Sequence, residues 1–184
     1  MKYRIIIVFS LIVLMIVVCI IINRQNRSVP SPDTLTRMAF SGQIYLSCKN
    51  DGLFIENSTF LTFLQNNSWG DTPVLVVWFS AQGCDKCVDY AVKKVNKQYA
   101  SKEGLLPLVF VGADYDNGIC LYPYDLLLKR KEYLGLPAEE LKTPFTFVYY
   151  HGLRHTFFPE ERFDELFESY LDSIFERYKH LPQS

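Results

Sequence analysis

The stretch PVLVVWFSAQGCDKC, residues 73–87, decides the predicted fold. Residues 73–80 form a continuous apolar run of strand length, which is typical of a strand buried on both faces. After this run, cysteine and apolar residues recur at the spacing of one helix face, at Cys84, Cys87, Val88, Ala91 and Val95. The stretch therefore predicts a buried strand that leads through a short turn into a helix beginning at two cysteines.

Patterns outside this stretch predict the main elements of an α/β domain. They are a helix over 58–64, a buried strand over 105–113, strands over 145–150 and 153–158 joined by a turn at His151-Gly152, and an amphipathic helix over 163–178. The aromatic stripe of the last helix is interpreted as core packing. The predicted fold class is α/β, with a central mixed β-sheet flanked by helices.

Two further predictions rest on shorter signals. Residues 43–47 and 53–56 flank Asn50-Asp51-Gly52, a turn signal, and so predict a second hairpin. Pro123 is expected to open a helix that runs to about Leu134, because proline suits the first position of a helix.

The N-terminal part of the chain predicts a transmembrane helix. Residues 5–22 form an apolar run with Ser10 as the single polar residue, and a helix of this length spans roughly 27 Å, close to a bilayer core. A cleaved signal peptide is the alternative, but its apolar run is shorter and small residues precede its cleavage site. We expect a single-pass anchor over 1–27, a tether over 28–42 and a domain over 43–184 outside the cytoplasm.

The charge distribution excludes one class of partner. Four of the 19 basic residues and none of the 20 acidic residues lie in residues 1–27, while the net charge of the whole chain is −1. The remainder is therefore acidic overall and has no basic cluster, which argues against nucleic-acid binding because phosphates must be neutralised. The expected non-protein partner is the lipid bilayer, reached through residues 5–22.

The sequence Cys84-Asp85-Lys86-Cys87 predicts thiol chemistry. At positions i and i+3 on a first helical turn, two sulfurs can approach closely enough to form a bond. The unpaired amides of that turn favour the thiolate of Cys84, which is the species that attacks a disulfide. Cys84 is the expected nucleophile and Cys87 the expected resolving thiol.

Together these features resemble the thioredoxin-like superfamily over roughly residues 70–180, most closely its membrane-anchored TlpA-type thiol-disulfide oxidoreductases. The matching features are the strand VLVVWFSAQG, the CDKC motif at a helix start and Thr143-Pro144 before the strand at 145–150. The resemblance implies that Pro144 is a cis-proline facing the redox pair and that Thr143 contacts the substrate backbone. It also implies an enzyme that reduces or isomerises disulfides of cysteine-containing exported proteins, with a membrane or extracytoplasmic redox partner and no cofactor.

The chain departs from the pattern of that family at two positions. Gly83 stands where an aromatic residue usually precedes the first cysteine, and Trp78 stands where thioredoxin places a buried acid. Trp78 is interpreted as a core residue.

Other interpretations of the cysteines remain open. Cys84 and Cys87 could form a structural disulfide in a non-catalytic binding module, because a fold does not fix a function. With His151 and His155 they could bind zinc, although the wide separation along the chain is unlike that of a compact zinc finger. Two further cysteines, Cys48 and Cys120, could pair with each other or act as accessory thiols, but by default they are expected to be buried apolar residues.

Overall fold

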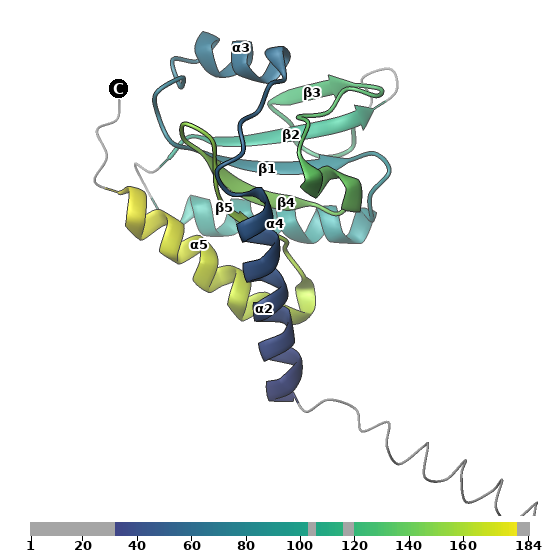
Figure 1. The fold of residues 1–184 in the computed structure, drawn as a ribbon, viewed down its shortest axis with the longest axis vertical. Helices are drawn as coiled ribbons and strands as arrows, with labels where there is room; N and C mark the ends of the chain where they lie inside the picture. The colour runs from purple at the N-terminus through teal and green to yellow at the C-terminus, as the bar shows by residue number, and fades with distance from the viewer. Residues whose placement is uncertain (1–31, 103–105, 116–119, 180–184) are drawn as a thin grey trace, which may run out of the picture. The chain divides into compact units, whose positions relative to one another are not determined.

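The computed structural model describes residues 32–102, 106–115 and 120–179. At its centre lies a five-stranded sheet with the order β3-β2-β1-β4-β5 (Figure 1). The strands are β1 Val74–Ser80, β2 Leu108–Tyr115, β3 Leu126–Lys129, β4 Phe145–Tyr149 and β5 Leu153–Phe157. The strands β1, β2 and β3 pair in parallel, whereas β4 and β5 are antiparallel additions. The predicted α/β class with a mixed sheet flanked by helices is confirmed.

The alternation of side chains along β1 divides the interior into two cores. Val74, Val76 and Trp78 point into one apolar cluster, while Leu75, Val77 and Phe79 point into another. The first core is covered by α3 Ser58–Asn66 and the short 3₁₀ helix η2 Pro137–Leu141, and the second by α4 Asp85–Ala100 and α5 Asp164–Tyr178. Figure 1 shows α3 on one side of the sheet and α4 and α5 on the other. All seven residues of β1 are buried, as a strand between two cores requires.

Several predicted elements are confirmed close to their expected bounds. They are the helix at 58–64, the strand before the cysteine pair, the helix that follows it, the strand at 105–113, the hairpin at His151-Gly152 and the last helix. Trp78 is a core residue as predicted, since it is fully buried and stacks on Phe145 with 4.9 Å between ring centroids. The aromatic stripe of α5 also packs in the core through Phe167 and Phe175.

The predicted hairpin over 43–56 is wrong, because a helix, α2 Pro32–Asn50, runs to the turn signal. Polar side chains of α2 and of Asp51, the residue after it, bond to backbone groups of β5 and of the residue that follows β5. The Gln43 side-chain amide donates to the carbonyl of Phe158 at 2.7 Å and accepts from the Phe158 N–H at 3.0 Å. The Asp51 carboxylate accepts from the N–H groups of His155 and Thr156 at 2.8 and 2.9 Å. These contacts cover an edge that another strand would otherwise pair with.

The predicted helix from Pro123 to Leu134 is also wrong. Part of this stretch forms β3, which extends the parallel side of the sheet beyond β2. The Asp125 carboxylate accepts from the N–H of Phe110 at 2.8 Å, and the Asp125 N–H donates to the Phe110 carbonyl at 2.9 Å. Pairing with the edge of β2 therefore overrides the helix signal of a single proline.

The predicted anchor lies outside the described residues. Among residues 32–102, 106–115 and 120–179, no helix is both long and apolar enough to cross a bilayer. Residues 5–22 precede these ranges, so the anchor stays a prediction. The stretch predicted as a tether, 28–42, overlaps α2 from Pro32 onward.

Candidate functional site

The cysteine pair lies at the N-terminus of α4, shortly after the end of β1. Cys84 is the N-cap residue of α4, with an extended backbone at φ −80° and ψ 112°. Its carbonyl accepts the first helical hydrogen bond from the Val88 N–H at 3.0 Å. Cys84 is exposed and Cys87, one turn later, is half-buried; both are free thiols. Both cysteines lie on the first turn of a helix, and the structure makes Cys84 the accessible thiol and Cys87 the recessed one.

The electrostatics of the pair differentiate the two thiols. The pKa of Cys84 is lowered, first by a hydrogen bond from the Cys87 thiol and then by the N–H groups of Cys87 and Lys86. These amides point toward the sulfur without forming a full capping hydrogen bond, and the Asp85 charge opposes them. The hydrogen bond to Cys84 and burial together raise the pKa of Cys87 to about 11. Cys84 is therefore the thiol that ionises first.

A hydrogen-bonded turn fixes the approach to Cys84. The Gly83 N–H donates to the Ser80 carbonyl at 2.9 Å, and the Gln82 N–H donates to the Ser80 hydroxyl at 3.2 Å. The Gln82 side chain donates to the carboxylate of Asp114, a buried residue with φ 61°. Asp114 also accepts the Lys131 N–H at 2.9 Å. The sequence patterns did not single out Gln82 and Asp114; the one signal for them is a polar residue near the end of each buried strand.

The loop that carries Thr143 and Pro144 lies against this turn. A Cβ atom added to Gly83 would sit 2.6 Å from the Lys142 carbonyl oxygen and 3.0 Å from that of Ser80. Only glycine allows the two backbones to come this close. Thr143 is exposed and Pro144 is buried. The structure thus brings the predicted substrate-binding loop to the residue that precedes Cys84, and it explains why an aromatic residue is absent there.

The cis geometry expected for Pro144 by resemblance is not found. No peptide bond among the described residues is cis, so the bond between Thr143 and Pro144 is trans. The trans form is the ordinary preference of an X–Pro bond.

The segment 120–124 contacts the residue that follows Cys84 and the strand that precedes it. The Tyr122 hydroxyl donates to the carbonyl of Asp85 at 3.0 Å, and its ring meets Phe79 edge to face at 5.9 Å. Cys120 is half-buried and packs against the same apolar cluster. Cys48 is exposed on α2, so the expectation that it is buried is wrong. The residue belongs to α2 and not to the end of a predicted strand, and its side chain lies on the exposed side of that helix.

The zinc interpretation is not supported by the placement of its residues. His151 lies in the exposed turn between β4 and β5, and His155 is half-buried in β5. Within the described part of the chain, no three side chains of histidine, cysteine, aspartate or glutamate gather as a metal site. The cysteine pair and the two histidines therefore do not converge.

A hollow of about 430 Å³ lies along α4, next to the cysteine pair. It is lined by Lys86, Asp89, Tyr90, Lys93, Lys94, Lys97 and Glu161. Lys94, only 9% exposed, is paired with Asp164 at 2.6 Å and with Glu168, and Lys93 is paired with Asp89 at 2.8 Å. The pairs of Lys94 tie α4 to α5, and all three ion pairs balance much of the positive charge that an anionic ligand would need.

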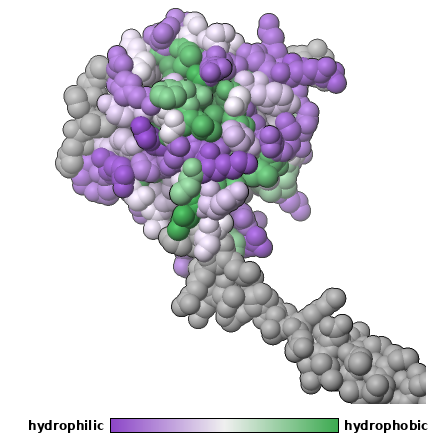
Figure 2. Space-filling view, in the orientation of Figure 1, coloured by the Kyte–Doolittle hydropathy of each residue, from purple (hydrophilic) through white to green (hydrophobic). Residues whose placement is uncertain are grey.

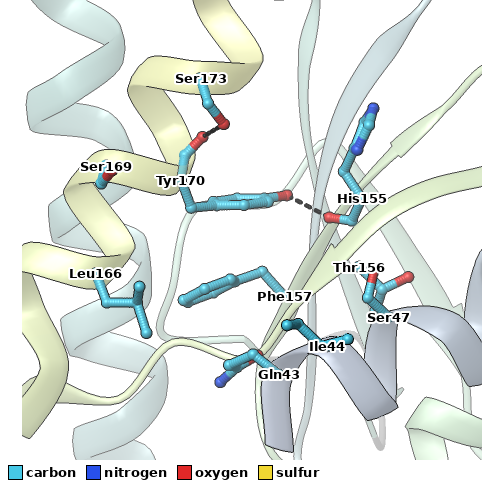
Figure 3. Close-up of a pocket in the computed structure, with 10 residues that line it drawn as sticks. All are labelled: Gln43, Ile44, Ser47, His155, Thr156, Phe157, Leu166, Ser169, Tyr170 and Ser173. Atoms are coloured by element: carbon cyan, nitrogen blue, oxygen red, sulfur yellow. Dashed lines mark hydrogen bonds between the residues drawn. The ribbon is translucent and has the colours of Figure 1, made fainter. Parts of the chain in front are cut away.

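A second hollow of about 290 Å³ lies between α2, β5 and α5 (Figure 3). The rings of Phe157 and Tyr170 stack at 4.5 Å, and the Tyr170 hydroxyl donates to the His155 carbonyl at 2.8 Å. Figure 3 shows the His155 imidazole directed away from these two rings. Ile44 and Leu166 add apolar walls. This hollow is an apolar groove, and neither cysteine of the CxxC pair lines it.

Comparisons with known proteins add no assignment, because no protein family, no curated protein and no solved structure matches the chain. The chemistry of the site therefore rests on the geometry described above.

The close approach at Gly83 predicts a specific loss of stability. Gly83→Ala should lower the free energy of unfolding by about 1–3 kcal/mol, because the added methyl group meets two backbone oxygens that cannot rotate away. Urea unfolding measures the change. Gly70→Ala is the matched control, since a Cβ at Gly70 meets nothing within 4 Å. Equal midpoints for the two variants would contradict the proposed contact.

The pKa pattern predicts the order in which the thiols react. In single-hit alkylation of the reduced chain, Cys84 should react fastest at pH 7, because a lowered pKa gives more thiolate at that pH. Cys87 should stay slow until the pH approaches about 11. Mass spectrometry of the cysteine peptides across pH measures both. Cys48 controls for access because it too is exposed; equal rates for Cys48 and Cys84 at pH 7 would refute the assignment.

Proposed function

We propose that the chain is a thiol-disulfide oxidoreductase of thioredoxin-like type that reduces or isomerises disulfides of exported proteins. The observation that carries this proposal is the pairing of an exposed Cys84 of lowered pKa with a recessed Cys87 of raised pKa on one helical turn. A structural disulfide needs no such difference between its thiols. The placement of the pair after a fully buried strand of a mixed sheet further supports the resemblance.

The proposed reaction is a two-step exchange. The Cys84 thiolate attacks one sulfur of the client disulfide; a Cys84–client bond forms, the client S–S bond breaks and the second client sulfur leaves as a thiolate. That thiolate takes the proton of the Cys87 thiol. Cys87 then attacks the Cys84 sulfur, which releases the first client thiolate. The client disulfide is reduced to two thiols, with the first client thiolate taking its proton from water, and the Cys84–Cys87 pair is oxidised to a disulfide.

The turnover of this reaction requires a second thiol protein. After one cycle the Cys84–Cys87 disulfide must be reduced by a dithiol, which is the chemical class of the proposed redox partner. Thiol exchange itself requires no cofactor. Thr143 is the proposed contact for the client backbone, because it is exposed on the loop that lies against Gly83; Pro144, buried beside it, positions that loop.

The proposed location is a membrane, with the domain outside the cytoplasm, because residues 5–22 are apolar over a bilayer-spanning length. The full-length chain should stay in the membrane pellet after carbonate extraction. A variant with Ile12→Asp and Ile16→Asp should be released, since charges at a helix centre oppose insertion. Release of the unchanged chain, or its recovery with a new N-terminus near residue 23, would contradict the anchor.

Cysteine variants test the proposed catalysis. Cys84→Ser should abolish reduction of a small model disulfide, because a serine hydroxyl does not attack a disulfide. Cys87→Ser should still be attacked once but should accumulate as a mixed disulfide, detectable by its added mass. Cys48→Ser is the matched control, since Cys48 is exposed yet lies on α2, and it should exchange at the unchanged rate.

The outcome also separates the two functional classes. A reduced wild-type chain that exchanges no faster than free cysteine, and that binds a client equally well after Cys84→Ser, would identify a non-catalytic binding module.

A further inference from the structure

Buried carboxylates are rare in the described part of the chain. Figure 2 shows one face of the molecule, on which hydrophilic residues surround an apolar area between α2 and α3. In the interior, only two carboxylates are buried among the described residues, Asp114 at 7% exposure and Glu139 at 4%. Both accept N–H groups of the segment 130–144, which joins β3 to β4 and carries Thr143 to the turn of the cysteine pair. Both buried carboxylates therefore hold the same segment.

The Glu139 carboxylate binds three successive N–H groups that precede η2. One oxygen accepts from Leu134 at 2.9 Å, and the other accepts from Gly135 at 2.7 Å and from Leu136 at 2.8 Å. Three successive amides meet one carboxylate where the chain curls around it, and Gly135 permits the curl with φ 88°. Burial raises the pKa of Glu139, and the three N–H groups oppose that rise because they stabilise the charged form. Since no lysine or arginine of the described residues forms an ion pair with this carboxylate, the three N–H groups take the place of water around it.

Glu139 also determines where η2 ends. Its N–H donates to the carbonyl of Leu136 at 3.0 Å, and its carbonyl accepts from the N–H of Lys142 at 3.2 Å. Lys142 has a left-handed backbone at φ 54°, a conformation that costs energy for a residue with a side chain and persists where its surroundings hold it. The carbonyl of Lys142 is the group that lies against Gly83. A continuous series of hydrogen bonds thus connects the buried carboxylate to the contact that precedes Cys84.

We propose that Glu139 is a positioning residue for client binding, because its carboxylate holds the 130–144 segment with Thr143 in place for a client at Cys84. This inference rests on the proposed function and adds a residue to it. A carboxylate fixes the directions of three amides, whereas apolar packing is non-directional. Loss of one acceptor oxygen would leave a buried N–H group without a partner and loosen the segment. The main groups that shift the pKa of Cys84 and Cys87 do not include Glu139, so the reactivity of the thiols should not depend on it.

Two disulfide substrates test the inference on the full-length chain in nanodiscs. One is a flexible peptide that carries a single disulfide, and the other is a small disulfide that reports on the thiols alone. Glu139→Gln should raise the KM for the peptide roughly tenfold, because it removes an acceptor of a charge-assisted hydrogen bond. It should leave kcat and the rate on the small disulfide unchanged. The matched control is Glu140→Gln, which makes the same change of charge at an exposed residue of the same 3₁₀ helix and should keep the KM of the unchanged chain.

A second variant decides the matter if thermal unfolding shows that Glu139→Gln does not fold. Gly135→Ala keeps the carboxylate but strains the curl around it, because Gly135 has φ 88° and its added Cβ would meet nothing within 4 Å. It should raise the peptide KM roughly fivefold. A folded Glu139→Gln chain with the KM of Glu140→Gln, an unchanged KM in Gly135→Ala, or a small-disulfide rate that falls as far as the peptide rate would each overturn the inference and leave the oxidoreductase proposal standing. Failure of the unchanged chain to reduce even the small disulfide would overturn both.

Discussion

The whole arrangement depends on the burial of β1 between two cores. Its seven residues pair with β2 on one side and β4 on the other, and their side chains alternate between the two apolar clusters. A shift of register by one residue would exchange the two sets of side chains, so the strand has one acceptable position. That constraint fixes where the strand ends at Ser80 and where α4 begins. The position of Cys84 follows from the packing of residues that never touch it.

Two contacts with backbone atoms bring other segments of the chain to the residues on either side of Cys84 in the sequence. Gly83 admits the Lys142 carbonyl at a distance that any side chain would prevent, and Asp85 receives the Tyr122 hydroxyl. Segments far apart in sequence are thereby held around one exposed thiol. The turn itself is held by Ser80 and by the contact between Gln82 and the buried Asp114. Ser80 and Asp114 belong to the neighbouring parallel strands β1 and β2, so the turn before Cys84 is bonded to both strands.

The pair of thiols separates its acidities without a buried acid. Trp78 occupies the position that the resemblance assigns to such an acid, and its indole nitrogen has no hydrogen-bond partner among the described residues. The separation comes instead from the hydrogen bond between the thiols and from the helix amides, which both favour a thiolate at Cys84. Cys87 keeps its proton to a pKa of about 11. In the proposed exchange, Cys84 loses its charge when it bonds to the client, so the interaction that raises the pKa of Cys87 is removed and the leaving client thiolate can take the Cys87 proton.

Local patterns in the sequence determined the strand at β1, the helix after it, the cysteine spacing, the hairpin at His151-Gly152 and the amphipathic α5, because each depends on periodicity or on a turn within a short stretch. Tertiary structure alone decided that α2 is a helix covering the edge of β5, that the stretch after Pro123 adds β3, and that Cys48 is exposed. These outcomes depend on which backbone groups need partners, and the partners come from distant parts of the chain. The close contact between Gly83 and the Lys142 carbonyl could not be predicted from the sequence either, because the feature that permits it is the absence of a side chain at Gly83.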